Sequence, residues 1–176
     1  KYLKEYSDNI NKISLNPRAP ISDKYKKSFK SKIHYKDDNE QLKILPARIR
    51  ITGDWQDHID RKKKISSLKI NLRKENIGHI VKFRLLLDES RDFEAEIFWS
   101  SLLEILGYPV LYKKIVNVSI NGLPPEKMLF EEIAVKEFME RFSLREAPIL
   151  EKDERKYWDL MSYAYKNCSS YMDRSL

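Results

Sequence analysis

The sequence predicts an α+β fold in which a few helices pack on a sheet that is rich in antiparallel pairs. Short segments of alternating polar and apolar residues occupy the middle of the chain, and turn-forming residues separate several of them. Helical periodicity is confined to separate segments near the start, the middle and the end. With 176 residues, the chain has the length of one ordinary domain with its own core.

The first expected elements are a helix and a hairpin. Apolar residues recur at helical spacing over residues 2–14. Residues 28–35 and 42–52 are typical of strands, and the polar turn between them predicts a hairpin. Pro46 lies inside the second strand. Because proline cannot donate a ladder hydrogen bond, we expect an edge position or a bulge there.

Two further strands are expected after a charged, irregular connection over residues 53–64. Residues 67–72 alternate strictly, which places their leucine and isoleucine side chains on one face and Lys69 with Asn71 on the other. Residues 81–87 predict the next strand.

The clearest helix is predicted over residues 88–106. Ser90 is positioned to cap its start, and Gly107 is positioned to end it. The apolar residues recur with a helical period, which predicts one broad apolar face. This face comprises Phe93, Ile97, Trp99, Leu102, Leu103 and Leu106.

The last third of the chain predicts a second hairpin and two more helices. Asn121 and Gly122 are a tight-turn signal between the two strands of the hairpin. The elements are a strand over 115–120, a strand over 127–130, a helix over 134–142, a short extended segment over 148–151 and a helix over 154–167.

The charge of the chain favours an anionic partner. The net charge is +7 and the pI is about 9.3, which suits a nucleotide, an acidic protein, an acidic glycan, nucleic acid or a membrane surface. Basic residues are concentrated in residues 1–36, which we treat as a basic helix and connection ahead of a lobe over 37–176. A segment of this kind is also typical of a solvated face.

Several classes of site lack support. A single cysteine, Cys168, excludes an internal disulfide and a cysteine-based zinc site. No apolar run approaches the roughly 20 residues of a membrane span. With four glycines, the chain has little material for a P-loop or a Rossmann site, and no hydrolase or zinc-protease motif is present. No signal for a cellular compartment is readable.

Four motifs, taken together and in order, resemble a known family. They are an arginine-bearing strand that runs into Gly-Asp-Trp-x-x-His, a following strand, a strand with an Asn-Gly turn, and an acidic pair followed by a helix and an Arg-Glu segment. These motifs occupy residues 46–58, 67–72, 116–122 and 131–150. Over roughly residues 40–158, the chain resembles the kinase-like family of spore-coat protein H (CotH).

The resemblance implies the N-terminal lobe of an atypical protein-kinase-like fold. Members of the family use ATP and Mg²⁺ to phosphorylate an acceptor, which implies an ATP-dependent phosphotransferase that acts on protein or glycan hydroxyls. In that fold a larger, helical lobe supplies the catalytic and metal-binding aspartates. The resemblance therefore makes this chain a fragment of a longer protein and assigns it no catalytic residue. Enzyme activity then depends on the second lobe.

The predicted cofactor-binding residues are Lys69, Arg50 and Glu132. In phosphoryl transfer, a strand lysine or arginine that faces the cleft holds phosphate oxygens, and Lys69 alternates with apolar neighbours. Glu131 and Glu132 lie where the resemblance places an acidic residue, and one of them can pair with Lys69 or a metal. Two plainer roles stay open. Lys69 can be a solvated strand lysine, and the glutamates can complement a helix N-terminus.

Asp54, Asp57 and His58 form a compact polar cluster that is a candidate for a metal or a substrate hydroxyl. The alternative is a loop whose side chains satisfy backbone groups and contact Arg48 or Arg50. We favour this alternative because no closing ligand is evident elsewhere in the sequence, so no metal site is assigned.

Three functions therefore remain open. The first is the lobe of an ATP-dependent phosphotransferase. The second is a non-catalytic, pseudokinase-like module that binds an anionic partner, either an acidic protein or a glycan. The third, nucleic-acid binding, is the least favoured, because charge and interleaved aromatic residues are its only support and no RNA-binding motif is present.

Overall fold

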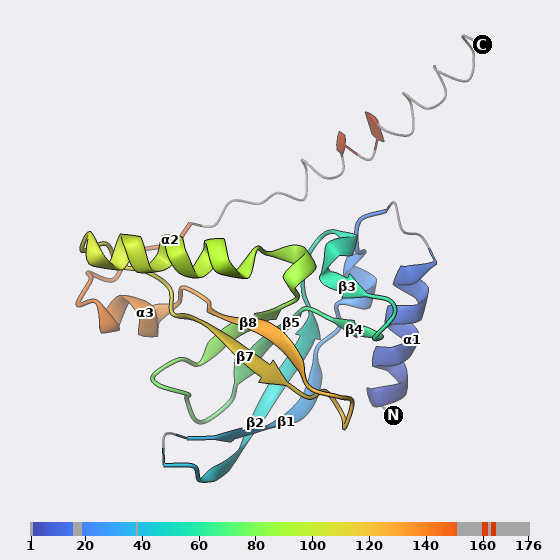
Figure 1. Ribbon diagram of the computed structural model, residues 1–176, viewed down its shortest axis with the longest axis horizontal. Helices are drawn as coiled ribbons and strands as arrows, with labels where there is room; N and C mark the ends of the chain where they lie inside the picture. The colour runs from blue at the N-terminus through green and yellow to red at the C-terminus, as the bar shows by residue number, and fades with distance from the viewer. Residues whose placement is uncertain (1, 16–18, 38, 151–159, 162, 165–176) are drawn as a thin grey trace.

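The computed structural model describes residues 2–15, 19–37, 39–150, 160–161 and 163–164 (Figure 1). Within these residues, the chain forms a six-stranded sheet in the order β1-β2-β5-β6-β8-β7 and a separate two-stranded ribbon of β3 and β4. Every strand pair is antiparallel. The predicted α+β fold with an antiparallel sheet is confirmed.

The elements follow the predicted order, with boundaries that shift by a few residues. The helices are α1 (Tyr2–Ser14), α2 (Phe93–Ile105) and α3 (Lys136–Arg141). The strands are β1 (Phe29–Lys36), β2 (Leu42–Ile51), β3 (Ile59–Asp60), β4 (Ile65–Ser66), β5 (Leu68–Leu72), β6 (Lys82–Leu86), β7 (Lys113–Val118) and β8 (Glu126–Glu132). The connection that was expected to be irregular contains the β3–β4 ribbon.

The main core lies inside the curl of the six-stranded sheet. Strands β2, β5, β6 and β8 each turn alternate apolar side chains toward it. These are Leu45, Ala47, Leu68, Ile70, Leu72, Phe83, Leu85, Met128 and Phe130. Ile33 of β1 and Val116 of β7 pack against the same cluster. Because both edge strands reach one core, the sheet is strongly curled (Figure 1).

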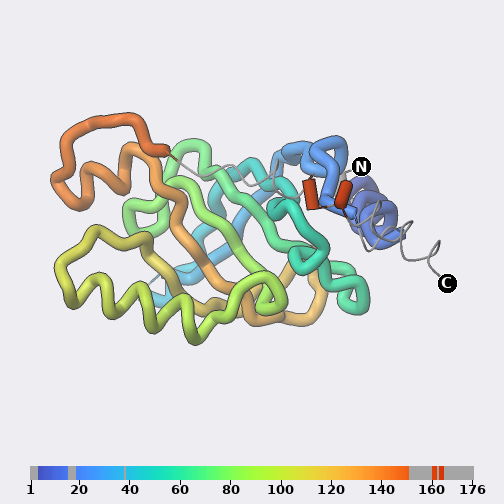
Figure 2. Tube along the Cα trace, turned by 90° about the horizontal axis from the view of Figure 1, so that it is seen from above, coloured from blue at the N-terminus to red at the C-terminus, as the bar shows by residue number. Residues whose placement is uncertain are grey.

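Helix α1 is joined to the sheet by a second apolar cluster. Ile10 and Ile13, one turn apart on α1, are buried together with Ile21, Ile51 and Ile59. Figure 2 shows α1 beside one end of the strands. The basic N-terminal segment therefore contributes both a packed helix and the edge strand β1 to the fold.

Strand β2 lies inside the sheet, so the edge position expected from Pro46 is wrong. The register with β1 runs through Pro46 without a bulge, and the ladder with β5 begins at Ala47. The carbonyl of Pro46 accepts a hydrogen bond from the backbone N–H of Arg73 at 3.1 Å. Because the N and O atoms of one strand residue point to the same side, the nitrogen of Pro46 faces the end of the β5 ladder. No hydrogen bond to β1 is lost.

Helix α2 begins later than predicted, and its cap is Asp92 rather than Ser90. A carboxylate oxygen of Asp92 accepts a hydrogen bond from the backbone N–H of Ala95 at 3.1 Å. Ser90 is buried in the short 3-10 turn before the helix, where its hydroxyl donates to the carbonyl of Leu87 at 2.7 Å. The hydroxyl is therefore already engaged within the turn.

The first turns of α2 carry its contact with the sheet. Phe93 is buried against Leu86 and Leu129, and Ile97 packs beside them. The rest of the predicted apolar face is less covered. Trp99, Leu103 and Leu106 are 59%, 41% and 61% exposed. The positive φ of Gly107 confirms the predicted end of the helix.

The tight turn at Asn121 and Gly122 is confirmed, since both residues have positive φ angles. The extended segment predicted over residues 148–151 forms no strand at 148–150, and residue 151 lies outside the described residues. Of the helix predicted over 154–167, the described residues 160–161 and 163–164 are helical, and the others lie outside the described part. None of the described helices combines the length and hydropathy needed to cross a bilayer.

Candidate anion-binding site

Strand register aligns five charged residues from five adjacent strands. Arg50 of β2 lies opposite Lys69 of β5, Lys69 lies opposite Arg84 of β6, and Arg84 lies opposite Glu131 of β8. Lys113 of β7 is the partner of Glu131 on its other side. Paired residues point to the same face of a sheet. We call this set the charged row.

The charged row lies on the face of the sheet opposite the main core. Leu86 and Leu129 are two residues away from Arg84 and Glu131, respectively, and they contact α2 on this face. The side chains of Arg84 and Glu131 are 25% and 13% exposed, and Arg50 and Lys69 are half-buried. The row is therefore partly sheltered and next to the packing site of α2.

A second row runs parallel to the first on the same face. Lys30 of β1 lies opposite Arg48, Arg48 lies opposite Asn71, and Asn71 lies opposite Lys82. We call these four residues the outer row. Each of its members on β2, β5 and β6 is two residues from a member of the charged row, which corresponds to about 7 Å along the strand. Together the two rows hold seven cations.

Helix α2 is connected to the charged row through Glu96. Its carboxylate pairs with the ammonium group of Lys113, and its second oxygen lies 3.6 Å from Nε of Arg91. Glu131 lies 3.9 Å from the guanidinium of Arg84, and its buried Oε2 atom accepts no hydrogen bond. Cations therefore dominate the part of the row from Arg50 to Arg84, and the carboxylates gather near α2.

The structure brings Lys69 and Arg50 together as direct cross-strand neighbours. The sequence also pointed to Glu131 or Glu132 as an acidic partner, and the register places Glu131 in the charged row. Glu132 lies opposite Phe83 on the core side of the sheet. A direct pairing of Glu132 with Lys69 is therefore wrong, because the sheet separates the two side chains.

Glu132 has a structural environment instead. Its side chain is 2% exposed, pairs with the guanidinium of Arg141, and accepts a hydrogen bond from the backbone N–H of Tyr112 at 3.0 Å. The N-cap of α3 is Val135, which makes no side-chain cap hydrogen bond. Glu132 therefore joins the end of α3 to the start of β7, and the cap role proposed for it is not what the structure contains.

Sequence reasoning missed Arg84, Lys113 and Glu96. The alternation of strand 82–86 carried a signal for Arg84, since the apolar side chains of Phe83 and Leu85 are buried on the opposite face. For Lys113 and Glu96, no local pattern indicates that a residue of the helix and a residue of the next strand will meet.

The polar cluster of Asp54, Asp57 and His58 does not form a metal site. Asp54 pairs with the buried ammonium group of Lys26 at 2.6 Å, and not with the strand arginines that we had considered. Within the described part of the chain, no group of three or more His, Cys, Asp or Glu side chains could hold a metal ion. Asp54 therefore has the structural role of the loop alternative, and its ion pair with Lys26 holds the loop in place.

The imidazole of His58 makes stability sensitive to acid. Burial lowers its pKa below the usual value of about 6.5, an effect that the nearby Asp57 carboxylate opposes. At this imidazole, the unfolded state therefore binds more protons than the folded state as the pH falls through about 6.5, so the contribution of His58 to stability decreases with falling pH. We expect urea unfolding to show less stability at pH 5 than at pH 7.5. His58→Gln should reduce this difference.

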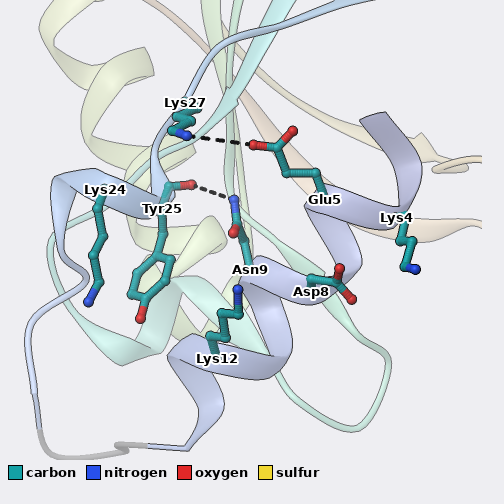
Figure 3. A pocket seen from close by; sticks show the side chains of 8 residues that line it. All are labelled: Lys4, Glu5, Asp8, Asn9, Lys12, Lys24, Tyr25 and Lys27. Atoms are coloured by element: carbon teal, nitrogen blue, oxygen red, sulfur yellow. Dashed lines mark hydrogen bonds and ion pairs between the residues drawn. The ribbon is translucent and has the colours of Figure 1, made fainter. Parts of the chain in front are cut away.

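An open pocket of about 700 Å³ lies between α1 and residues 24–27 (Figure 3). It is lined by Lys4, Glu5, Asp8, Asn9, Lys12, Lys24, Tyr25 and Lys27. Glu5 lies 3.9 Å from Lys27, and the Asn9 amide donates to the carbonyl of Tyr25 at 3.2 Å. Its lining mixes both signs of charge and includes no member of either row. We therefore place the candidate site on the sheet face, where cations adjoin one another.

No protein-family model matches the sequence, and no curated protein or solved structure matches it. The geometry of the charged row and the sequence motifs are therefore the basis for assigning a function.

Proposed function

We propose that the chain is the nucleotide-binding lobe of a CotH-like, kinase-fold phosphotransferase that uses ATP and Mg²⁺ to act on protein or glycan hydroxyls. One observation carries the proposal. Arg50, Lys69 and Arg84 stand side by side on three adjacent strands, on a polar face beside a helix. In this proposal they hold the phosphate groups of the nucleotide.

The three adjacent cations of the charged row suit a polyphosphate. A polyphosphate carries several negative groups in a line, so three cations in register on adjacent strands can contact it together. Neighbouring strands are about 4.8 Å apart, so Arg50, Lys69 and Arg84 together span roughly 10 Å. Two of its members are arginines, whose planar guanidinium groups bind phosphate through paired hydrogen bonds.

The order of elements around the row also supports the proposal. In protein kinases, a cation on the strand before a helix contacts the phosphates and pairs with a glutamate of that helix. Here β6 precedes α2, carries Arg84, and is followed by β7 and β8, with β8 next to β6. One feature departs from that pattern, because Glu96 of α2 pairs with Lys113 of the following strand. We assign Lys113 to holding the helix and Arg84 to binding phosphate.

A second candidate is a non-catalytic, pseudokinase-like module that binds an anionic partner. Phosphoryl transfer requires carboxylates that hold Mg²⁺, and the described residues contain no cluster of three metal-binding side chains. Mg²⁺ is usually held by one or two carboxylates together with the phosphates, and none is assigned to that role here, whereas a binding module needs no such carboxylate. This observation is what keeps the second candidate in consideration.

Calorimetric titration with ATP and Mg²⁺ tests whether the charged row binds a nucleotide. We expect Lys69→Ala and Arg84→Ala each to weaken binding about tenfold, because each removes a charge-assisted hydrogen bond of about 1.5 kcal/mol or more. Lys114→Ala is the matched control, since Lys114 is an exposed strand lysine next to Lys113 but on the other face. Its affinity should equal that of the unchanged chain.

Equal affinities of all three variants would remove the charged row from nucleotide binding. A titration with inorganic tripolyphosphate separates the two candidates further. A nucleotide lobe should prefer ATP to tripolyphosphate, and a general anion module should bind both alike.

A further inference from the structure

The edge strand β1 carries a basic surface that nucleotide binding does not use. β1 is the first strand of the sheet and pairs with β2 alone among the described strands. Lys30, Lys32 and His34 point to the same face as the two rows and are exposed. Figure 1 shows the β1–β2 hairpin extending away from α2 and α3. The free edge is therefore accessible within the part of the chain that the structure describes.

The cations at this edge lack compensation. Lys30 lies directly opposite Arg48, a like-charge pair that destabilises the sheet. Lys32 lies opposite Pro46, which brings no carboxylate. Among the described residues, Lys30, Lys32 and Arg48 form no ion pair. The edge thus combines open backbone hydrogen-bonding groups with unneutralised positive charge.

We propose that β1 is a docking edge for an acidic peptide segment, which adds to the sheet as a further strand. An extended peptide presents alternate side chains on one face, with a spacing of about 7 Å. The docked peptide becomes the strand next to β1, and acidic residues at alternate positions of the peptide then lie opposite Lys30 and Lys32. Backbone hydrogen bonds supply affinity, and the paired charges supply specificity and register.

The open backbone favours a peptide over other polyanions. The outward N–H and C=O groups of an edge strand match the backbone of another strand, and neither a glycan nor a nucleic acid presents that alternating pattern. Lysines on an edge strand also discourage unwanted pairing between proteins. The same lysines repel a basic strand, lose hydration against a neutral one and attract an acidic one, so the two roles are compatible.

A fluorescent peptide of 8 residues, the length of β1, tests the proposal by anisotropy. It alternates glutamate with threonine. We expect binding by the unchanged chain and at least tenfold weaker binding by the Lys30→Glu/Lys32→Glu double variant. Lys114→Glu is the matched control, because Lys114 is an exposed lysine on β7, the opposite edge strand. It should bind the peptide as the unchanged chain does.

Two further measurements keep the test independent of folding defects and of docking mode. A peptide that alternates lysine with threonine should bind the double variant better than it binds the unchanged chain, which a misfolded variant would not do. A glutamate–threonine peptide with N-methylated backbone should lose binding, because it cannot pair with β1. Retained binding of the N-methylated peptide, or equal binding by the double variant, would overturn the proposal.

Competitors decide between classes of partner. A heparin-type oligosaccharide or single-stranded RNA that binds β1 more tightly than the peptide, and loses affinity in the double variant, would also overturn it. ATP binding should be unchanged in the single variant Lys32→Glu, since Lys32 lies opposite Pro46 and belongs to neither row. Failure of nucleotide binding and failure of peptide docking are therefore separate results.

Discussion

Gly53→Ala is expected to cost about 3 kcal/mol of stability, the sum of a steric clash and backbone strain. Gly53 has φ +95°, a region that L side chains rarely adopt, and a Cβ atom there would lie 1.9 Å from Cδ2 of His58. The imidazole is itself half-buried between the loop and its neighbours. Neither atom can yield without moving the chain between β2 and β3. Urea unfolding followed by tryptophan fluorescence measures the loss.

Gly78→Ala is the matched control for the backbone component. Gly78 also has a positive φ, +55°, but nothing lies within 4 Å of its added Cβ. We expect a loss of about 1 kcal/mol, which reflects strain alone. In the Gly53→Ala background, His58→Ala should cost less than it does by itself, because it removes the two ring contacts at 1.9 and 2.0 Å and leaves only the Cβ contact at 2.6 Å. Equal losses for the two glycine variants would show that the imidazole yields easily and would refute the steric argument.

Glu132→Ala is expected to cost a comparable amount, about 3 kcal/mol, because it leaves a charge and a backbone donor without their partner. Glu132 is almost fully buried, whereas the side chain of its partner Arg141 is 29% exposed. The loss should therefore lie at the lower end of the range for broken buried pairs. The backbone N–H of Tyr112 also loses its acceptor. Urea unfolding again provides the measurement.

A double variant distinguishes the cost of breaking the Glu132–Arg141 pair from the net contribution of the intact pair to stability. Glu132→Met/Arg141→Met replaces both charges with apolar side chains and should recover most of the stability. Glu140→Gln is the surface control. Glu140 pairs with Lys136 at 3.4 Å, and both side chains are more than half exposed, so we expect a change within about 0.5 kcal/mol. If Glu132→Ala matched Glu140→Gln, the assignment of a structural role to Glu132 would be wrong.

Much of the sheet was predictable because strand alternation is a local property. The pattern of residues 67–72 placed Lys69 and Asn71 on the face opposite their apolar neighbours, and burial confirms this. The first hairpin and the Asn-Gly turn were equally readable. Errors arose where the outcome depended on a distant partner. Pro46 is tolerated in an interior strand only because the ladder with β5 begins one residue later.

The start of α2 shows the same limit. Ser90 and Asp92 are both good cap residues, and the sequence offers no local reason to choose between them. The turn that buries Ser90 is stabilised by tertiary contacts, among them the hydrogen bond from the backbone N–H of Leu87 to Oγ of Ser67. That contact joins residues 20 positions apart, which no local pattern encodes.

For the candidate site, the sequence by itself determined which side chains turn outward from the core, because the apolar residues of each strand decide which face is buried. It thereby identified Lys69 and Arg50 as candidates, and the net charge of +7 favours an anionic ligand. Only the tertiary structure decided which outward residues become neighbours. Strand order and register are set by long-range pairing, and a shift of one residue moves a side chain to the other face. That pairing aligned Arg84 with Lys69, and it put Glu131 in the charged row while it buried Glu132 on the core side.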